Sequence, residues 1–247
     1  MMSVAGHMAA GYGTSANPET DRMWAGLEAA LERLAGVDAI FYLVFPVNGS
    51  AGAFETLLDR AVWRCTYPQT FRDDLPRGFL ADDMSSQLVL LTRRPVLWHS
   101  DEATQAATPA QLKRLEINRR HGMAVGISIP VFNASGHVCG GFGLRHGAQD
   151  AAAFDEAWKR NRDGIMAELA SFDQAYRGPF ARHVFRLSPQ ELRVLAGAAA
   201  GMTASQAAHD LGLSQKTVEA YLRSARDKTL SVTTTEAVAK AVFFHLV

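Results

Sequence analysis

The amino-acid sequence predicts an α+β N-terminal domain followed by an all-α domain. Strand-like apolar runs, most of them in hairpin-like succession, lie among amphipathic helical segments in the first 175 residues. Four helix-capping signals then follow one another after residue 187. The simplest packing is an α-β-α sandwich around a five-stranded antiparallel sheet, followed by a four-helix helix-turn-helix domain. We expect a flexible lead-in at 1–19, the α+β domain at 20–176, a linker at 177–186 and the all-α domain at 187–247.

The composition fits a globular chain of one large or two modest domains. Of its 247 residues, 48% are hydrophobic, which is ample for buried cores. Lys plus Arg and Asp plus Glu number 25 each, so no overall charge excess indicates a nucleic-acid partner. Cys65 and Cys139 match no metal or redox spacing. The N-terminus lacks the pattern of a secretory signal and no segment reaches the roughly 20 apolar residues of a membrane span, so we expect a cytoplasmic protein with no membrane partner.

Local signals place the elements of the α+β domain. Apolar spacing predicts a helix over 21–34, ended by Gly36. Thr108-Pro109-Ala110-Gln111 has the form of a capping box and predicts a helix to about Arg120. A long helix is predicted from Asp150 to about Tyr176, where Arg177-Gly178-Pro179 would break it. The apolar runs of strand length are 37–45, 61–66, 87–91, 95–98, 124–132 and 137–145, the last two joined by a four-residue hairpin loop.

The C-terminal stretch has the pattern of a helix-turn-helix. Ser188-Pro189-Gln190-Glu191 is a capping box, and Thr203-Ala204-Ser205-Gln206 repeats its form. Gly212-Leu213 supplies a tight turn, after which Ser214 caps a helix from Gln215 to about Lys228. This last helix carries four basic residues, as a helix that reads DNA does. The alternative is that these bases form only the solvated face of an amphipathic helix.

This pattern resembles the DNA-binding domain of the LuxR-type bacterial transcription regulators. The motifs that carry the resemblance stand at the family's spacing: Leu187-Ser188-Pro189-Gln190-Glu191, Leu195, Gly201-Met202-Thr203, Ala207, Leu211-Gly212-Leu213-Ser214, Thr217-Val218 and Thr235-Glu236-Ala237-Val238. Thr229 and Thr234 depart from it, because a Lys and an Arg are common there. Each departure implies one phosphate contact fewer.

The resemblance implies double-stranded DNA as a partner. A recognition helix enters the major groove with its N-terminal half against the base edges. The residues expected to read bases are Lys216, Thr217, Glu219, Ala220 and Arg223. Arg226 and Lys228 are better placed for phosphates. Glu219 would either accept from a cytosine amino group or turn away. Because this helix carries few basic residues, tight DNA binding requires a dimer. We therefore expect a homodimer on a palindromic operator, with RNA polymerase as a further partner.

The first 175 residues resemble the autoinducer-binding domain of quorum-sensing regulators, whose ligands are N-acyl homoserine lactones. They do not alternate strand and helix as a phosphorylated receiver domain would. The carriers of the resemblance are Tyr67-Pro68, Asp83, Pro95-Val96-Leu97-Trp98 and the run from His121 to Pro130. The resemblance implies no cofactor beyond a small-molecule effector.

The family's pocket maps onto seven residues of this chain: Tyr67, Phe71, Leu75, Asp83, Trp98, Ser128 and Gly143. At the position of Asp83 an acidic residue accepts the ligand's amide N–H, and the residue at Trp98 walls the lactone ring. The alternatives are a capping or surface carboxylate and a core aromatic. Phe71 and Leu75 stand where the family has a Trp and a Tyr that donate to the ligand's two carbonyls. A carbonyl left buried and unpaired costs on the order of 1–3 kcal/mol, so Tyr67 would have to compensate.

Three functions follow, in decreasing order of support. The first is a DNA-binding regulator controlled by a small signal, either an N-acyl homoserine lactone or a non-standard relative. The second is a ligand-independent regulator whose N-terminal domain serves dimerisation or interaction, which the changes at Phe71 and Leu75 motivate. The third is an enzyme, and its only support is two glycine fragments, Gly11-Tyr12-Gly13 and Gly141-Phe142-Gly143. Neither fragment has the strand-turn-helix context of a catalytic glycine motif, so we expect no catalysis.

Overall fold

The computed structural model describes residues 17–46, 61–75, 79–104 and 107–247. Most of the expected lead-in and the Gly11–Gly13 fragment lie outside these residues. The chain forms two compact units, Met1–Phe172 and Asp173–Val247. Within the described ranges, no helix has the length and apolar character needed to cross a membrane.

The first unit is built on a five-stranded antiparallel sheet, as the sequence predicts. Its strands, in the spatial order β2-β1-β5-β4-β3, are β2 (Val62–Cys65), β1 (Val37–Val44), β5 (Val138–His146), β4 (Gly126–Phe132) and β3 (Val96–Leu97). Three of the four pairings join strands that follow one another in sequence. The fourth joins β1 to β5 across about a hundred residues of chain, which puts β5 at the centre of the sheet.

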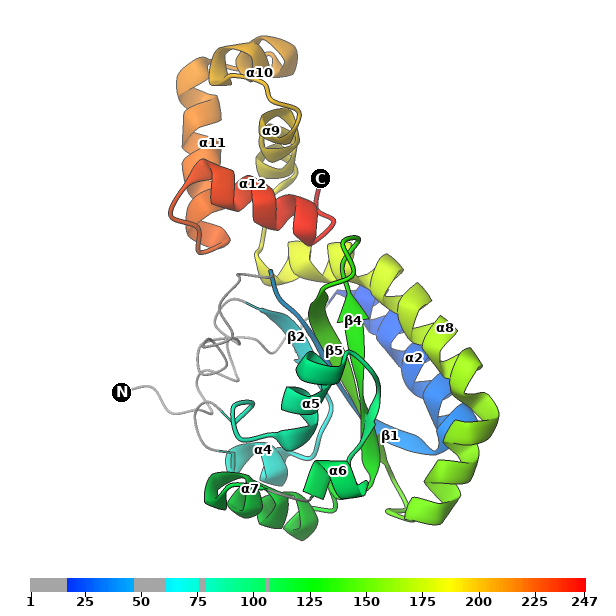
Figure 1. The fold of residues 1–247 in the computed structure, drawn as a ribbon. Helices are drawn as coiled ribbons and strands as arrows, with labels where there is room; N and C mark the ends of the chain where they lie inside the picture. Colours follow the sequence, from blue (N-terminus) through cyan, green and yellow to red (C-terminus); the bar gives the residue numbers. More distant parts are fainter. Residues whose placement is uncertain (1–16, 47–60, 76–78, 105–106) are drawn as a thin grey trace. The chain divides into compact units, whose positions relative to one another are not determined.

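Helices cover both faces of the sheet (Figure 1). On one face lie α2 (Pro18–Ala35), which begins at the Asn17 cap and ends at Gly36 with φ 62°, and α8 (Ala151–Val184). On the other face lie the short helices α4 (Gln69–Asp73), α5 (Met84–Thr92), α6 (Asp101–Thr104) and α7 (Pro109–Arg120). The predicted capping box between Thr108 and Gln111 is present at the start of α7.

One local prediction in this unit was wrong. The apolar run at 87–91 belongs to helix α5 rather than to a strand, because Asp83 caps the preceding turn and commits the segment to a helix. A short apolar run does not by itself distinguish a buried strand from a helix. The short helix α4, after Tyr67, was not predicted.

The two faces of the sheet have different interiors. The rings of Tyr42 and Phe142, on adjacent strands, lie 4.9 Å apart between centroids at a tilt of 36°, and both meet the edge of Phe172 of α8. Side chains alternate along a strand, so Phe41 and Leu43 of β1 point to the opposite face. There they join a second cluster with Trp63, Phe71, Leu75 and Phe79. The first interior is closely filled with aromatic rings, whereas the second contains a cavity.

Helix α8 continues past the predicted break at Arg177-Gly178-Pro179 and ends at Val184, with Pro179 inside it. The prediction that the helix ends near Tyr176 was therefore wrong. Contacts within the second unit explain the continuation: the buried Arg177 pairs with Asp173 one turn earlier and donates to the Phe243 carbonyl at 3.3 Å. A Cβ at Gly178 would lie 2.7 Å from the His245 carbonyl oxygen, so only glycine allows this approach. These contacts outweigh the helix-breaking propensity of Gly and Pro.

The second unit contains the four predicted short helices. They are α9 (Pro189–Ala199), α10 (Ala204–Leu211), α11 (Gln215–Lys228) and α12 (Thr234–Phe243). Ser188 and Thr203 form complete capping boxes, and Ser214 and Thr233 cap the last two helices through their hydroxyl groups. Gly212 ends α10 with φ 65°, so the turn between α10 and α11 is the one the sequence specifies.

The close pairing of β1 with β5 predicts that Gly140→Ala destabilises the first unit by about 1–3 kcal/mol. A Cβ at Gly140 would lie 2.9 Å from the Val44 Cα and would overlap the Leu43 carbonyl oxygen. All four tryptophans belong to this unit, so thermal unfolding followed by tryptophan fluorescence measures it selectively.

The matched control is Gly26→Ala in α2, where a new Cβ meets nothing within 4 Å. This change should stabilise the unit by about 0.5–1 kcal/mol, because alanine favours a helix interior. If Gly140→Ala melted no lower than the wild type, the β1–β5 register would be wrong.

Candidate functional site

A cavity of about 370 Å³ lies in the first unit, within the second of the two interiors described above. All seven predicted pocket residues line it: Tyr67, Phe71, Leu75, Asp83, Trp98, Ser128 and Gly143. They come from α4, α5, the three strands β3 to β5 and the turns beside them, so residues 76 positions apart meet at one place. The volume is in the range of small-molecule sites.

Glycines on the central strand leave room for the cavity. Gly141 and Gly143 both line it, while Phe142 between them points to the other face of the sheet. Gly143 pairs with Phe41 on one side and with Ser128 on the other. A Cβ at Gly143 would overlap the Tyr67 hydroxyl. The Gly141–Gly143 fragment is thus explained by strand packing and not by phosphate binding.

Asp83 combines the predicted cavity position with a capping role. Its Oδ1 accepts from the Ser86 backbone N–H at 2.8 Å, which caps α5, and from the Ser85 hydroxyl at 2.6 Å. Its Oδ2 lies 3.3 Å from Nη2 of Arg114 on α7. The carboxylate therefore already has three donors from the protein.

The polar groups of Trp98 and Ser128 belong to the same network. The Trp98 indole N–H donates to the Ser128 Oγ at 2.8 Å, and Ser128 Oγ lies 2.9 Å from Ser85 Oγ. Ser85 has one proton and gives it to Asp83, so Ser128 donates to Ser85. The donors form a chain that runs from Trp98 to the Asp83 carboxylate, and each member polarises the next.

Tyr67, Phe71 and Leu75 form the apolar part of the wall. Phe71 and Leu75 are buried, and neither has a polar group to offer a ligand. Burial raises the pKa of the Tyr67 phenol well above its ordinary value, and the negative charge of Asp83 adds to that shift. The phenol is therefore a hydroxyl donor at neutral pH.

The sequence reasoning missed several polar residues of this wall, among them Ser85 and Arg114, whose side chains both contact Asp83. Arg114 is 6% exposed and lies 5.2 Å above the Phe71 ring. No motif marked it, and a charged residue on a surface helix is ordinary. The signal that could have found it is the spacing of Gln111, Arg114 and Asn118, which puts three polar side chains on one helix face.

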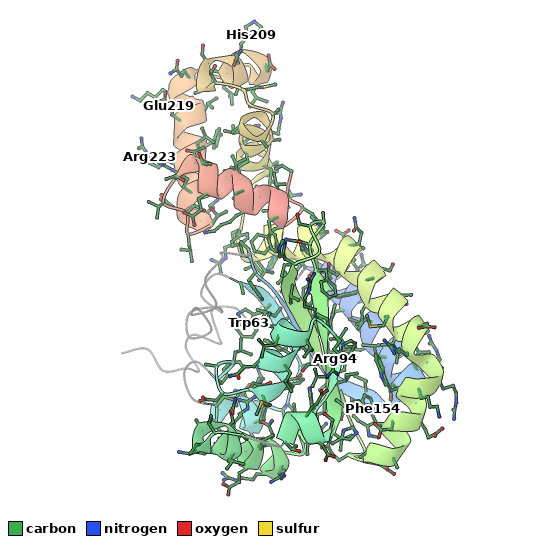
Figure 2. All side chains as sticks on the ribbon, viewed as in Figure 1. Trp63, Arg94, Phe154, His209, Glu219 and Arg223 are labelled. Carbon is green, nitrogen blue, oxygen red and sulfur yellow. The ribbon has the colours of Figure 1, made fainter. Side chains whose placement is uncertain are left out.

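The second candidate site is the exposed face of α11. This helix packs against α9, α10 and α12 through Val218, Leu222 and Ala225. Lys216, Glu219, Ala220 and Arg223 are exposed on the other side, and Glu219 and Arg223 point away from α9 (Figure 2). Glu219 accepts from the Gln215 side chain at 2.9 Å, while the half-buried Thr217 contacts the Ser214 hydroxyl at 2.8 Å and takes part in the cap.

Lys228 has a structural partner. Its ammonium lies 2.8 Å from Oε2 of Glu191, whose Oε1 accepts from the Ser224 hydroxyl at 2.6 Å. Glu191 thereby completes the α9 capping box and ties α9 to α11. Burial by itself raises the pKa of Glu191. Hydrogen bonds from Lys228, Ser224 and Ser188 outweigh this effect and lower the pKa to about 2.

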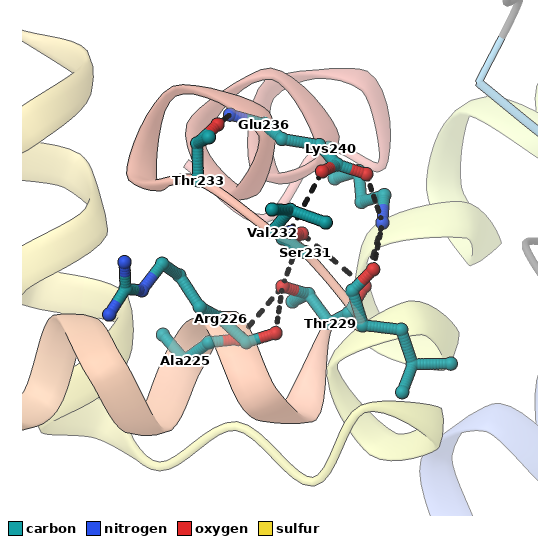
Figure 3. A network of polar contacts seen from close by, with 9 residues as sticks. Ala225, Arg226, Thr229, Ser231, Val232, Thr233, Glu236 and Lys240 are labelled. Atoms are coloured by element: carbon teal, nitrogen blue, oxygen red, sulfur yellow. Dashed lines mark hydrogen bonds and ion pairs between the residues drawn. The ribbon is translucent and has the colours of Figure 1, made fainter.

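The C-terminal end of α11 is fixed by a network with α12 (Figure 3). The buried Lys240 donates to the carbonyls of Thr229 and Leu230 at 2.9 and 2.8 Å and pairs with Glu236. Thr229 is 1% exposed, and its hydroxyl donates to the Ala225 carbonyl. The Thr229 hydroxyl therefore satisfies a backbone carbonyl at the end of α11. This structural role gives a reason for a threonine at this position, where the family commonly has a lysine. Arg226 is half-buried, and its Nε has no partner within the described part of the chain.

The Glu191 network predicts that Glu191→Gln destabilises the second unit by about 2 kcal/mol at pH 7. The lowered folded-state pKa means that this stabilisation is complete above the ordinary value of 4.5 and is lost as the pH falls towards 2. The difference between variant and wild type should therefore shrink over that range. Urea unfolding followed by circular dichroism measures it, and tryptophan fluorescence should show the first unit unchanged. Glu219→Gln, which removes an exposed carboxylate from α11, should have little effect at either pH.

The contact between Gly143 and Tyr67 predicts a rescue. Gly143→Ala alone should lower the melting temperature of the first unit, because its methyl group overlaps the Tyr67 hydroxyl. The double variant Gly143→Ala/Tyr67→Phe removes the overlapping oxygen and should recover most of the loss. A double variant less stable than Gly143→Ala alone would contradict this geometry.

Two family models match the chain. The autoinducer binding domain matches residues 19–175, and the luxR family of bacterial regulatory proteins matches residues 186–241. Among solved structures, the chain is similar to SdiA in complex with octanoyl-rac-glycerol, with 15% identity, a TM-score of 0.51 and coverage of 97% of this chain and 94% of that one. It is also similar to Escherichia coli SdiA in the space group P6522, with 17% identity, a TM-score of 0.50 and coverage of 92% and 91%. At these identities the likeness shows a shared fold. No curated protein matches the sequence significantly.

The first family model covers more than half of the chain, and the second covers α9, α10, α11 and most of α12. The cavity lies within the first match and the exposed face of α11 within the second. The chain therefore belongs to the LuxR-type quorum-sensing transcription regulators, with an autoinducer-binding domain followed by a luxR-family helix-turn-helix domain.

Proposed function

We propose that a small, partly apolar signal molecule binds in the cavity and that its binding controls how the helix-turn-helix domain engages DNA. The observation that carries this proposal is the convergence of all seven predicted pocket residues on one cavity. A ligand that fills the cavity buries apolar surface on Phe71, Leu75 and Trp98 and so stabilises the folded domain by mass action. The ligand shifts the DNA-binding population only to the extent that it prefers the competent conformation.

The proposed ligand is an N-acyl homoserine lactone or a non-standard relative. Phe71 and Leu75 supply no donors for a lactone or acyl carbonyl, which favours the non-standard relative. One of the structures with a similar fold, SdiA, holds octanoyl-rac-glycerol, an acyl chain on a head group other than a lactone. Tyr67 is the wall residue that offers a hydroxyl to such a head group.

For the DNA-binding domain, we propose that Lys216, Thr217, Glu219, Ala220 and Arg223 face the base edges and that Arg226 contacts phosphate. The exposure of most of these residues on one side of α11 supports the assignment. Lys228 is a weaker candidate for phosphate, because its ammonium also holds Glu191. We further propose a homodimer on a palindromic operator, contact with RNA polymerase and action in the cytoplasm, where operator DNA lies.

A ligand-independent regulator is the second candidate. The chain of hydrogen bonds from Trp98 through Ser128 and Ser85 to Asp83 favours it, because these polar groups are satisfied without a ligand. The cavity favours the ligand-controlled regulator, because a pure interaction module has no need of such a volume in its interior.

The DNA-reading assignment predicts that Arg223→Ala weakens binding to a selected operator by about 1–3 kcal/mol and relaxes the sequence preference at one base pair. Lys216→Ala should weaken binding by a similar amount. The protein first selects its operator from a random DNA pool, and fluorescence anisotropy at several salt concentrations then gives the affinity and the salt slope of each variant.

The matched control is Arg162→Ala, which removes one exposed positive charge from the sensor domain. It should bind the operator like the wild type. Operator binding that survives the double variant Lys216→Ala/Arg223→Ala unchanged would exclude α11 as the reading helix.

A further inference from the structure

Helix α7 presents polar side chains to the interior of the sensor domain. Gln111 and Arg114 are buried and Asn118 is half-buried, while Leu112 of the same helix is 55% exposed. Arg114 and Asn118 both line the cavity. The helix thus buries an arginine and leaves a leucine exposed. Burying a charged side chain costs free energy unless the charge has a partner in the interior.

The guanidinium of Arg114 is only partly satisfied. Among the described residues it forms an ion pair with Asp83, at 3.3 Å, which is long for a charge-assisted hydrogen bond. It also contacts the rings of Phe71 and Phe79 at 5.2 and 5.4 Å. Its Nε and Nη1 have no acceptor among the residues that the structure describes. Burial lowers the pKa of Arg114, and the charge of Asp83 opposes that shift.

The other polar groups of the wall leave little for a ligand that donates. Asp83 already accepts three hydrogen bonds, and the donors of Trp98, Ser128 and Ser85 are used within the chain that ends on it. The donors left for a ligand are Nε and Nη1 of Arg114 and the Tyr67 hydroxyl, while the buried Oδ1 of Asn118 is an acceptor without a partner among the described residues. A ligand that supplies acceptors can therefore pair with Arg114 and Tyr67.

The charge of the wall points the same way. The described lining residues include three arginines, Arg72, Arg114 and Arg119, and one carboxylate, Asp83. Of these arginines only Arg114 is buried, while Arg72 is half-buried and Arg119 is exposed, so Arg114 supplies the positive charge inside the cavity and the other two add to it from the rim. Such a cavity attracts an anion, and its low polarity strengthens the attraction.

We propose that the signal molecule is an anionic amphiphile, with an apolar body in the cavity and a carboxylate head group on Arg114 and Tyr67. This inference rests on the proposed ligand control and specifies the class of ligand. Arg114 would exchange part of its long contact with Asp83 for a direct pair with the ligand carboxylate. The Tyr67 hydroxyl, whose ring also contacts Phe71, would donate to the same head group.

The test compares three probes that share a ten-carbon chain: decanoate, methyl decanoate and N-decanoyl homoserine lactone. Their dissociation constants with the full-length protein come from titration calorimetry below the micelle concentration of decanoate, and tryptophan fluorescence gives the melting shifts. Decanoate should bind about tenfold or more tightly than its methyl ester, the factor expected for one charge-assisted pair.

Two variants and a control locate the effect. Arg114→Gln should abolish the preference for decanoate over the ester. Because that change leaves Asp83 buried without its cation, Asp83→Asn/Arg114→Gln removes both charges and should give the same result in a better-folded protein. Arg120→Gln, at an exposed position of the same helix, should keep the preference.

The outcomes separate this inference from the proposed function. Equal or tighter binding of the ester or the lactone by the wild type would overturn the anionic class and leave ligand control intact. A preference for decanoate that persists in the double variant would overturn the role of Arg114. If no probe bound, and operator affinity were unchanged in the presence of each, the result would count against ligand control itself.

Discussion

The pairing of β1 with β5 is the interaction on which the sensor site depends. It joins segments about a hundred residues apart and places β5 between β1 and β4. Gly141 and Gly143 then lie on the cavity face, beside Phe41 and Ser128, where any side chain would fill the space. On the opposite face, aromatic rings pack closely against one another. One face of the sheet is therefore closely packed, whereas the other borders a cavity.

Each domain uses a buried or half-buried carboxylate to join helix capping to tertiary structure. Asp83 caps α5 and reaches Arg114 on α7, which draws the cavity wall together. Glu191 completes the capping box of α9 and holds Ser224 and Lys228 of α11, which fixes α11 against α9. In both places the carboxylate is held by several donors, which offsets the cost of its desolvation. The local signals of helix initiation therefore also set the geometry of the two sites.

The predictions that held depended on local chemistry. Capping boxes, the Gly36 and Gly212 terminators and the hairpin at residues 133–136 involve neighbours in sequence, and all formed as expected. One error came from a local helix cap that was not recognised, and the other from contacts between distant residues. Residues 87–91 are apolar enough for either a strand or a helix, and only their position after the Asp83 cap makes them helical. The stretch at 177–179 stays helical because Asp173 and the end of α12 hold it.

By itself, the sequence determined the α+β and helix-turn-helix classes, the four capped helices of the second unit, the family resemblance and the seven residues that gather at the cavity. The tertiary structure decided which of their polar groups remain unused. The motif positions of Asp83, Trp98 and Ser128 could not reveal that Ser85 links them, or that Arg114 turns inward while Leu112 faces outward. The reason is physical: hydrogen-bond saturation and side-chain burial depend on groups brought together from separate helices and strands, and a linear pattern does not contain that arrangement.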